Sequence, residues 1–487
     1  MTQQIATESK YMWFLNKSGI MYKEYQREGV EWCVNLETHN NPELPIHGGF
    51  IADEMGLGKT IMMIATFACN YLPHTLIVLP NILMEQWAHE IFRTTKHHVL
   101  IYHGKDKKNI TMAQLEAAPI VLTTYSAISL NTSGLLFAVE WNRVVFDEAH
   151  HLRNDTQRNT GARLLKSGIK WFISGTPIQN KKKDFYNLCS ALNMPASYYS
   201  EPKNLPHLIQ HFVLRRTKKQ VGIEIPDVVF NERFIDWDTE EEKKLADDIH
   251  KASKHASRDF RLKLYTQARQ SCILPALLIG KTEEMVKYGI YPRVNPETLN
   301  KCSKMDVVIS TILSRKDNGN GKLIFCHYKG EIDAIYNRLS ENGITRICIF
   351  DGRTNQMERA RKIKMAFDVV ILQIQTGCEG LNLQEHFSEI YFVSPNWNPF
   401  VEKQAVARCH RIGQKKEVSV FSFQMTDFVD YFDQEDDPIP GTVEEEELVG
   451  YEEGIEKKPS MTSSLDNYIS IVKNGKIRLV EEIMPTT

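Results

Sequence analysis

The chain lacks any C-x-x-C pair, any apolar run of membrane-spanning length and any N-terminal secretory signal. Its nine cysteines form an odd, scattered set, which argues against a disulfide framework or structural zinc and favours a reducing, intracellular compartment. The longest apolar stretch, residues 61–72, is interrupted by Asn70 and is more typical of a core helix than of a membrane span. These absences predict a globular protein with no membrane partner.

Charge is unevenly distributed along the 487 residues. Between Asp427 and Glu456 there are 13 acidic residues and no Lys or Arg, and removing these charges from the formal net charge of −2 leaves +11 for the rest. A basic body with an acidic segment is compatible with a polyanionic partner, but charge alone favours a simple solvated tail. We therefore expect residues 427–487 to form an acidic, partly disordered tail, in which the Asn474-Gly475 dipeptide predicts a small hairpin.

Two regions alternate buried-strand patterns with amphipathic helix patterns, as parallel α/β sheets do. The strand patterns of the first region lie at 50–52, 75–79, 99–102, 120–125, 143–147 and 171–175. Those of the second region lie at 322–328, 346–350, 369–374, 389–394 and 418–423. Helical spacing separates the strands, for example in residues 82–92, 331–343 and 356–367. The sequence therefore predicts an α/β fold with two copies of one architecture, joined by the charged, helical segment 218–302.

The stretch FIADEMGLGKT, residues 50–60, looks like a phosphate-binding loop, although the strict spacing G-x-x-x-x-G-K-[ST] would place a glycine at Asp53. A strand pattern precedes it and a helix pattern follows, so the loop stands where a helix N-terminus can receive a phosphate. Gly56 and Gly58 free the backbone to turn its N–H groups inward. Lys59 would reach the β/γ-phosphates of ATP, and Thr60 would contact Mg²⁺.

The stretch VVFDEAHH, residues 144–151, supplies the acids that such a loop needs. Two carboxylates end a β-branched and aromatic run, at the carboxyl edge of a predicted parallel strand, where these sheets bind ligands. Asp147 suits a Mg²⁺ contact, often through water, and Glu148 is the candidate that orients the attacking water. Acids at a strand end are common, but together with a GKT loop about 90 residues upstream they indicate a nucleotide site.

The stretch EKQAVARCHRIGQ, residues 402–414, reads as a helix with Gln404, Arg408 and Arg411 on one face. Two guanidiniums and an amide make a poor core face and a good clamp for a phosphoryl group that gains charge in transfer. We therefore predict that these three side chains are catalytic and are supplied to the nucleotide by the second region.

The motifs resemble, in order, those of the Swi/Snf-type ATPases of helicase superfamily two, in which the phosphate loop is written D-E-M-G-L-G-K-T. Asp53 therefore matches the family. The resemblance covers residues 22–423, and "HRIGQ" with "WNP" favours this family over the RNA helicases that share DEAH. Its further motifs are YKEYQREGVEW (22–32), VLPNILMEQWAHEI (78–91), LTTYS (122–126), SGTPIQN (174–180), FVLRRTKKQV (212–221), IFCHY (324–328), FDGRT (350–354) with Arg359, GCEGLNLQ (377–384) and NWNP (396–399).

The resemblance implies two RecA-like lobes with a nucleotide cleft between them and ATP with Mg²⁺ as cofactors. It also implies double-stranded DNA as a partner, bound without sequence preference and with strong salt dependence, and transcription or chromatin proteins as candidate partners. The implied cofactor-binding residues are Gln26, which would read the adenine, with Asp53, Glu54, Met55, Gly56, Leu57, Gly58, Lys59 and Thr60. The candidate nucleic-acid contacts are Pro80, Thr123, Thr124, Arg215 and Trp397, although core packing explains Trp397 equally well.

Two features depart from the family. Residues 374–383 lack the Thr, the Arg and one glycine of the fifth motif, T-R-A-G-G-x-G-x-N-L, so we expect ATP binding to survive and strand contact or coupling to change. No chromatin-reading or additional DNA-binding module is apparent, and the chain resembles equally the compact motors of large DNA viruses and bacteria. Nucleus, cytoplasmic virus factory, virion and bacterial cytoplasm are therefore not distinguished.

The predicted domains are an N-terminal extension (1–21), a first RecA-like, ATP-binding lobe (22–217), a helical connector or protrusion (218–302), a second RecA-like lobe (303–426) and the acidic tail (427–487). The predicted function is that of a Mg-ATP-dependent translocase on duplex DNA, which remodels protein–DNA complexes or assists transcription. Two alternatives remain: a strand-separating or RNA-directed helicase of the same superfamily, and a nucleotide-gated scaffold that binds nucleic acid without turnover.

Overall fold

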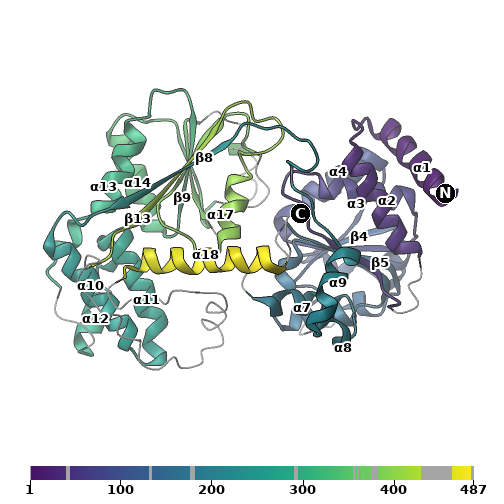
Figure 1. Cartoon of the computed structure of the whole chain (residues 1–487), viewed down its shortest axis with the longest axis horizontal. Helices are drawn as coiled ribbons and strands as arrows, with labels where there is room; N and C mark the ends of the chain where they lie inside the picture. The colour runs from purple at the N-terminus through teal and green to yellow at the C-terminus, as the bar shows by residue number, and fades with distance from the viewer. Residues whose placement is uncertain are drawn as a thin grey trace. The chain divides into compact units, whose positions relative to one another are not determined.

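The computed structural model describes residues 2–39, 44–130, 134–175, 181–289, 294–354, 367–374, 382–428 and 463–483, with isolated positions between 358 and 365. The chain divides into two compact units (Figure 1). Unit 1 comprises Met1–Glu224 and Leu479–Thr487, and unit 2 comprises Ile225–Arg478. No helix in the described ranges is long and apolar enough to cross a bilayer.

Unit 1 is built on a sheet of seven parallel strands in the order β3-β4-β2-β5-β6-β1-β7. Every crossover in this order brings the carboxyl ends of the strands to one edge, where the predicted phosphate loop and acids lie. The strands are β1 (His47–Ile51), β2 (Thr75–Leu79), β3 (Leu100–Tyr102), β4 (Ile120–Thr124), β5 (Trp141–Asp147), β6 (Ser167–Ile173) and β7 (Val213–Leu214).

The helices of unit 1 cover both faces of this sheet because its strands alternate two sets of apolar side chains. Ile51, Val145 and Ile173 share a core with side chains from α1, α2, α3 and α4. On the other face Phe50 contacts Phe172 and Phe185, the latter from α7. The helices are α1 (Thr2–Ser18), α2 (Glu24–Thr38), α3 (Lys59–Cys69), α4 (Met84–Thr95), α5 (Met112–Ala117), α6 (Gln157–Leu164), α7 (Lys182–Ala191), α8 (Ala196–Tyr199) and α9 (Leu205–Phe212).

A buried ion pair fastens α2 to the sheet of unit 1. Arg143 on β5 donates to both carboxylate oxygens of Glu37 on α2, at 2.6 Å each, and the two side chains are no more than 1% exposed. The Glu37 carboxylate also accepts the indole N–H of Trp171 and the amide N–H of Asn70, at 2.8 and 2.7 Å. Four donors thus saturate one buried carboxylate, which is the condition for burying a charge without a large penalty.

Unit 2 is built on a second parallel sheet, of six strands in the order β10-β11-β9-β12-β13-β8. The prediction of two parallel-sheet copies in an α/β fold is therefore confirmed, while a nucleotide cleft between the lobes stays a prediction. The strands are β8 (Val228–Ile235), β9 (Gly321–Cys326), β10 (Ile347–Phe350), β11 (Val369–Gln373), β12 (Phe387–Phe392) and β13 (Val418–Met425).

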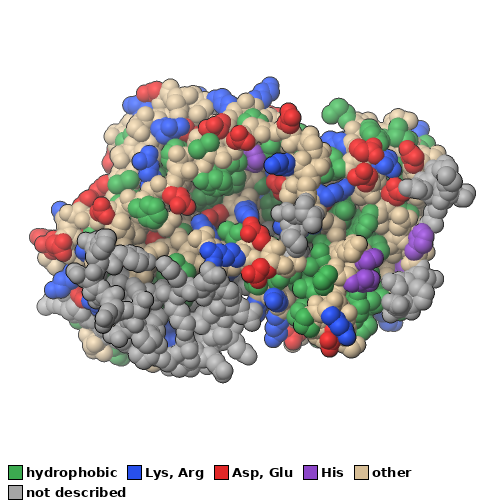
Figure 2. All heavy atoms as spheres, viewed as in Figure 1, with side chains coloured by type: hydrophobic (Ala, Val, Ile, Leu, Met, Phe, Trp, Pro, Cys, Tyr) green, Lys and Arg blue, Asp and Glu red, His purple; other side chains and the backbone are tan. Residues whose placement is uncertain are grey.

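The charged segment that follows unit 1 contributes both a strand and helices to unit 2. β8 lies at the edge of the second sheet, and α10 and α11 share an apolar cluster with α12 and α18. The helices of unit 2 are α10 (Glu240–His255), α11 (Arg258–Ile273), α12 (Thr282–Lys287), α13 (Ser303–Leu313), α14 (Lys329–Glu341), α17 (Pro399–Val406) and, up to Arg478, α18 (Leu465–Ile483), the last yellow in Figure 1. On the face shown in Figure 2, acidic and basic side chains are interspersed.

The predicted hairpin around Asn474-Gly475 is wrong, because both residues lie inside helix α18. Asp466 in the first turn is buried, and its carboxylate accepts hydrogen bonds from the Lys304 ammonium, the Ser394 hydroxyl at 3.3 Å and the Met425 amide at 3.0 Å. Apolar side chains at helical spacing, among them Leu465, Ile469 and Val472, are buried as well. Tertiary burial of one helix face has outweighed the local turn preference of Asn-Gly. The acidic residues 429–462 lie outside the described residues.

The Glu37→Ala variant tests the buried ion pair of unit 1. Removing the carboxylate leaves the Arg143 guanidinium buried without its partner, so we expect a loss of about 3–5 kcal/mol in the free energy of unfolding. Urea unfolding followed by circular dichroism would measure it. As a matched control, Glu31→Ala on the same helix removes a partly exposed partner of Arg27. Equal losses in the two variants would contradict the importance of the buried pair.

Candidate functional site

The predicted phosphate loop lies in unit 1 between β1, which ends at Ile51, and α3, which begins at Lys59. Gly56 and Gly58 have φ angles of 92° and 80°, a left-handed conformation that side chains disfavour. Gly58 is the N-cap of α3, so the first N–H groups of the helix face the loop. The geometry is that of a loop which can bind an anion at a helix N-terminus.

Lys59, the first residue of α3, is half-buried where the loop meets the helix. Its ammonium donates to the carbonyl oxygen of Asp53 at 2.7 Å and to that of Glu54 at 3.4 Å. Burial lowers the pKa of Lys59, while the nearby carboxylates of Glu148, Asp53, Asp147 and Glu54 oppose that shift. The ammonium and the predicted catalytic acids are thus close enough to interact within one unit.

Gln26, the predicted adenine reader, lies against the same loop. Its side chain is 4% exposed and its amide donates to the carbonyl of Leu57 at 3.1 Å. On the opposite side, a methyl group added to Gly175 would come within 3.1 Å of the Met55 side chain and 3.6 Å of the Lys59 ammonium. Gly175 of the SGTPIQN motif therefore allows close approach to the loop, while residues 176–180 of that motif lie outside the described residues.

Asp147 is the last residue of β5, and it is held by two side chains that the sequence interpretation did not single out. The indole N–H of Trp87 on α4 donates to one carboxylate oxygen at 2.6 Å, and the hydroxyl of Tyr125 donates to the Asp147 carbonyl at 2.6 Å. The amide of Glu148 donates to the other carboxylate oxygen at 2.9 Å. Trp87 lies in the segment recognised as a helix, but spacing alone gives no signal that its indole reaches an acid 60 residues away.

Glu148 follows β5 in a left-handed conformation, with φ at 52°, and does not continue the extended strand. Such a conformation is uncommon for a residue with a side chain and is found at functional sites. One of its carboxylate oxygens is 3.2 Å from Nδ1 of His150. The turn therefore separates the two acids by role, with Asp147 buried beneath Trp87 and Glu148 partly exposed beside His150.

The residues at this edge fit a hydrated Mg²⁺ ion. Burial raises the pKa of Asp147 to about 7, with the Glu148 carboxylate adding to the shift, so a nearby cation would stabilise its ionised form. Thr60 is the second residue of α3 and offers a hydroxyl from the adjoining helix. Within the described ranges, no group of three or more His, Cys, Asp or Glu could hold a metal. A few protein oxygens combined with water and phosphate suit Mg²⁺ better than a cage of protein ligands.

The predicted helix over residues 402–414 is shorter than expected, because α17 ends at Val406. Gln404 lies in the helix and is buried, while Arg408 and Arg411 lie in the turns beyond it, so the three do not form one helix face. Arg411 donates to the side-chain carbonyl of Asn382. Burial lowers the pKa of Arg411, and the neighbouring Arg408 lowers it further.

The two arginines nonetheless form a cationic pair in unit 2. Nε of Arg408 is buried without a hydrogen-bond partner among the described residues, and no described carboxylate forms an ion pair with either guanidinium. Two adjacent, partly buried cations without a carboxylate partner among the described residues favour an anionic ligand. Of residues 374–383, which depart from the fifth motif, 375–381 lie outside the described residues, as does Arg359. Ile374, which stands where the motif has Thr, is buried directly after β11.

The candidate nucleic-acid contacts have different environments. Thr123 is fully buried, and its hydroxyl donates to the Tyr102 carbonyl at 2.9 Å. Thr124 is buried beside Ser126 at 2.9 Å. Arg215 is partly buried, with one terminal nitrogen lacking a partner among the described residues, and burial lowers its pKa. Pro80 is partly exposed at the end of β2, and Trp397 packs edge-to-face on Tyr468 of α18. Their role in binding nucleic acid stays a prediction.

A buried polar cluster joins two motif segments of unit 2 to α11. Arg269 on α11 donates to Nε2 of His327 at 2.7 Å and to the carbonyl of Pro395. Glu331 accepts the amide N–H groups of His327 and Tyr328, at 2.8 and 3.0 Å. Burial raises the pKa of Glu331 to about 7 and lowers that of His327. The IFCHY segment and the loop before NWNP are therefore positioned by one neutral histidine and one cation.

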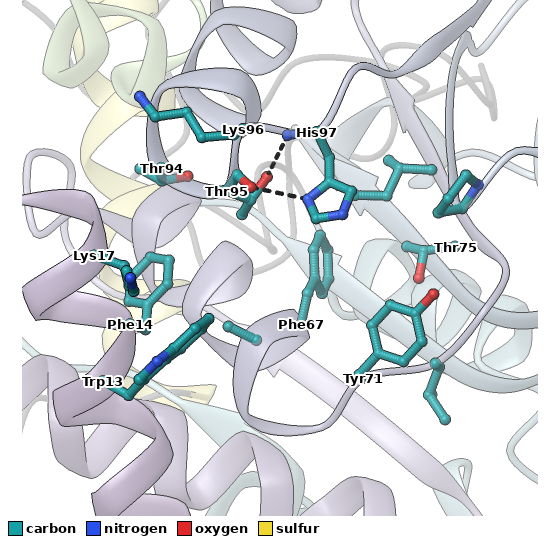
Figure 3. A pocket seen from close by; sticks show the side chains of 14 residues that line it. Trp13, Phe14, Lys17, Phe67, Tyr71, Thr75, Thr94, Thr95, Lys96 and His97 are labelled. Atoms are coloured by element: carbon teal, nitrogen blue, oxygen red, sulfur yellow. Dashed lines mark hydrogen bonds between the residues drawn. The ribbon is translucent and has the colours of Figure 1, made fainter.

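A cavity of about 450 Å³ lies elsewhere in unit 1 (Figure 3). It is bordered by the carboxyl end of α3 and by the first residues of β2 and β4, the edge of the sheet opposite the phosphate loop. The hydroxyls of Thr94 and Thr95 already donate to backbone carbonyls, and Thr95 is also bonded to His97. The cavity is mainly apolar and does not resemble a phosphate site. Its lining includes Trp13, Phe14, Lys17, Phe67, Tyr71, Leu72 and Ile120.

Comparison with known proteins identifies two domains. Residues 25–203 match an SNF2-related domain, and residues 303–413 match a helicase conserved C-terminal domain. The chain is 29% identical over 453 residues to a probable ATP-dependent DNA helicase of Arabidopsis thaliana, covering 82% of this chain and 40% of the plant protein. It is 27% identical to a probable global transactivator of Orgyia pseudotsugata multicapsid polyhedrosis virus, covering 82% of this chain and 85% of the viral protein.

Among solved structures, the SWI2/SNF2 ATPase core of Sulfolobus solfataricus in complex with double-stranded DNA is 25% identical, covers 84% of this chain and 88% of that chain, and has a TM-score of 0.40. The chain spans less than half of the length of the plant helicase and most of that of the viral protein. The two domain matches confirm the resemblance to the Swi/Snf type that the motifs indicated.

The Trp87→Phe variant tests whether the indole N–H holds Asp147 in its ionised form. Losing this donor should raise the pKa of Asp147 further, so the Mg²⁺ concentration for half-maximal ATP hydrolysis should rise several-fold, more at about pH 6.5 than at about pH 8. Trp141→Phe is a matched control, because Trp141 lies at the other end of β5 from Asp147 and its indole N–H donates to the Leu136 carbonyl. An equal Mg²⁺ requirement in both variants would show that Trp87 serves packing only.

The Glu331→Gln variant tests the buried cluster of unit 2. An acid whose pKa is raised to about 7 on folding contributes stability that is fully present below the unfolded value near 4.5 and is lost as the pH rises through 7. Glutamine removes the titration, so its stability relative to the parent should increase over this window, by at most about 1.4 kcal/mol per pH unit. Denaturation at a series of pH values measures this. Glu341→Gln, at the exposed end of α14, should leave the pH profile unchanged, and a flat difference for Glu331→Gln would contradict the assignment.

Proposed function

Because the chain is of the Swi/Snf type, with an SNF2-related domain followed by a helicase conserved C-terminal domain, we propose that it is a Mg²⁺-dependent ATPase that moves along double-stranded DNA. The observation that carries this proposal is the convergence of Lys59, Asp147 and Glu148 at the carboxyl edge of one parallel sheet. These residues come from a phosphate loop and a strand end, and they interact electrostatically within a buried site. A set of this kind is needed for phosphoryl transfer and has no evident structural purpose.

Each residue has a role that its position supports. The loop amides and Lys59 would bind the β/γ-phosphates, with the ammonium leaving the Asp53 carbonyl to do so. Asp147, fixed by Trp87, would hold the cation together with Thr60. Glu148, in its turn beside His150, would orient the attacking water and accept its proton. A bound Mg-ATP supplies the phosphoryl group to be transferred, and its metal ion offsets the negative charge of the phosphates.

Unit 2 would contribute Arg408, Arg411 and Gln404. The uncompensated positive charge of the two arginines supports a role in stabilising the transferring phosphoryl group. Supplied from a second unit, these groups would make hydrolysis depend on how the units approach each other, which is how such motors convert turnover into movement. This role is a proposal that extends beyond the geometry of either unit alone.

We propose duplex DNA as the track, contacted through its phosphates. Of the candidate residues Pro80, Thr123, Thr124, Arg215 and Trp397, the two threonines are buried in this structure, so their hydroxyls would reach a phosphate only after a local rearrangement. Apart from Arg215, none of these side chains makes bidentate contacts to base edges, and binding through phosphates would be independent of sequence and sensitive to salt. Remodelling of protein–DNA complexes or assistance to transcription would follow, with transcription or chromatin proteins as partners.

The first alternative is a strand-separating or RNA-directed helicase of the same superfamily. The ATPase rate distinguishes this helicase from a translocase on duplex DNA. It is measured in parallel with no nucleic acid, single-stranded DNA, duplex DNA, nucleosomes and RNA. Stimulation by duplex DNA is expected, and stimulation by RNA alone would contradict the proposal. A labelled duplex with a single-stranded overhang should remain paired during ATP turnover, whereas release of the strand would favour a helicase.

The second alternative is a scaffold that closes on ATP without turnover, and Glu148→Gln tests it. The variant keeps the Lys59 and Asp147 contacts, so it should bind a fluorescent ATP analogue with near-parental affinity. Its ATPase rate should fall at least 100-fold, of the order of the contributions made by positioned general bases. His89→Gln on the exposed part of α4 is a control for substitution as such. Turnover like that of the parent in Glu148→Gln would overturn the catalytic assignment, and absence of turnover in the parent would favour the scaffold.

A further inference from the structure

We propose that Arg216 and Lys218 are positioning residues for the phosphate loop, which hold and neutralise the two carboxylates at its start. The proposal rests on the proposed function, because it explains how a loop that begins with Asp53 and Glu54 can receive a triphosphate. Neither cation belongs to the loop, and both come from the segment that follows β7, the last strand of unit 1.

The first pair is buried and bidentate. Nη2 of Arg216 donates to one carboxylate oxygen of Asp53 at 2.6 Å, and Nε donates to the other at 3.1 Å. The backbone N–H of Arg216 adds a third hydrogen bond to Asp53, at 2.9 Å. The Asp53 side chain is 1% exposed, so its charge is compensated by this guanidinium and not by water.

The guanidinium occupies a slot shaped for it between α2 and α3. It lies 5.7 Å from the ring centroid of Tyr25, and its Nη1 donates to the Tyr25 carbonyl. A methyl group added to Gly29 would come within 2.9 Å of Nη2, so the absence of a side chain there admits the arginine. A side chain fixed on several sides defines the position of its partner, which is what a positioning role requires.

The second pair repeats this arrangement one residue later. The ammonium of Lys218 donates to one carboxylate oxygen of Glu54 at 2.8 Å, and the backbone N–H of Lys218 donates to the other at 2.8 Å. Lys218 is 6% exposed and Glu54 is 40% exposed, so this pair is more open to solvent than the first. Alternate residues of one extended segment thus bind consecutive acids of the loop.

The backbone between the side-chain pairs links the two segments as well. The amide of Ala52 donates to the Leu214 carbonyl at 2.7 Å, and the amide of Glu54 donates to the Arg216 carbonyl at 2.9 Å, which extends the pairing of β1 with β7 into the loop. The Asp53 carbonyl between these amides accepts the Lys59 ammonium. Movement of Arg216 would therefore displace the carbonyl on which the phosphate-binding lysine rests.

Electrostatics supplies the reason for the arrangement. A triphosphate is strongly anionic, and two unpaired carboxylates in its binding loop would repel it across a site where burial weakens screening by water. With Arg216 and Lys218 in place, the four side chains are neutral as a group, and Lys59 and the amides at the start of α3 remain to attract phosphate. The acidic start of the loop then costs no affinity for the nucleotide.

The test is a pair of double-mutant cycles in the full chain, measured as the dissociation constant of a fluorescent ATP analogue with Mg²⁺. Arg216→Ala should weaken binding by about tenfold or more, because it leaves a buried carboxylate near the phosphates. The same change in an Asp53→Asn background should weaken binding much less, since the residue at position 53 then carries no charge that could repel the nucleotide. Lys218→Ala should weaken binding by a few-fold, with relief by Glu54→Gln, because that pair is more exposed.

Controls separate positioning from folding and from the proposed function. Lys219→Ala removes an exposed cation directly after Lys218 and should leave the dissociation constant unchanged. Arg216→Lys keeps the charge but loses the bidentate contact, so it should restore part of the affinity lost in Arg216→Ala. If Arg216→Ala does not fold, as judged by circular dichroism, the double-mutant cycle of Lys218 and Glu54 tests the positioning role instead.

The inference is overturned if the parent binds ATP but the cation variants bind it equally well, or if their losses are undiminished when the acid is neutralised. That outcome leaves the ATPase proposal intact. Failure of the parent chain itself to bind or hydrolyse ATP overturns the proposed function instead, so the two failures are distinguishable.

Discussion

The structure of unit 1 depends on one constraint, the placement of the half-buried Lys59 ammonium at the carboxyl edge of a parallel sheet. A cation that is partly removed from water must be compensated, and here compensation comes from the Asp53 and Glu54 carbonyls and from the nearby carboxylates of Asp147 and Glu148. Burial raises the pKa of Asp147 to about 7, and the neighbouring Glu148 carboxylate adds to that shift. The positive and negative side chains of the site therefore offset one another, while the ammonium and the carboxylates can still bind further ions. This combination suits an ion complex such as Mg-ATP.

Buried polar contacts between distant motifs give both units their organisation. Trp87 reaches Asp147, Arg216 reaches Asp53, and Arg269 connects His327 to the carbonyl of Pro395. Each contact joins segments between 58 and 163 residues apart, so each motif is positioned by another and not by its own local structure. This interdependence explains why individually weak sequence patterns carry information when they occur together and in order.

The strands and the loop could be predicted because their signals are local. β-branched runs predicted the strands of both sheets within a few residues, except β7 and β8, of which β8 lies in the segment predicted to be helical. The glycines at 56 and 58 adopt the positive φ angles that the loop pattern required. The ends of helices were less predictable. The arginine segment was expected to stay helical to residue 414, but α17 ends at Val406, and the Asn474-Gly475 turn signal was overridden by burial of one face of α18. Trp87 and Arg216 lie in motifs that the sequence singled out, but nothing in the sequence identified Asp147 and Asp53 as their partners, because only the tertiary fold brings these residues near.

The central claim is that Lys59 exchanges a backbone carbonyl for phosphate at the carboxyl edge of the first sheet. The most direct measurement is a structure of the full chain with Mg²⁺ and a non-hydrolysable ATP analogue. The account predicts that the Lys59 ammonium leaves the Asp53 carbonyl for the β/γ-phosphates and that the metal lies beside Asp147. A nucleotide bound away from the loop, or one that leaves Lys59 on the Asp53 carbonyl, would contradict it.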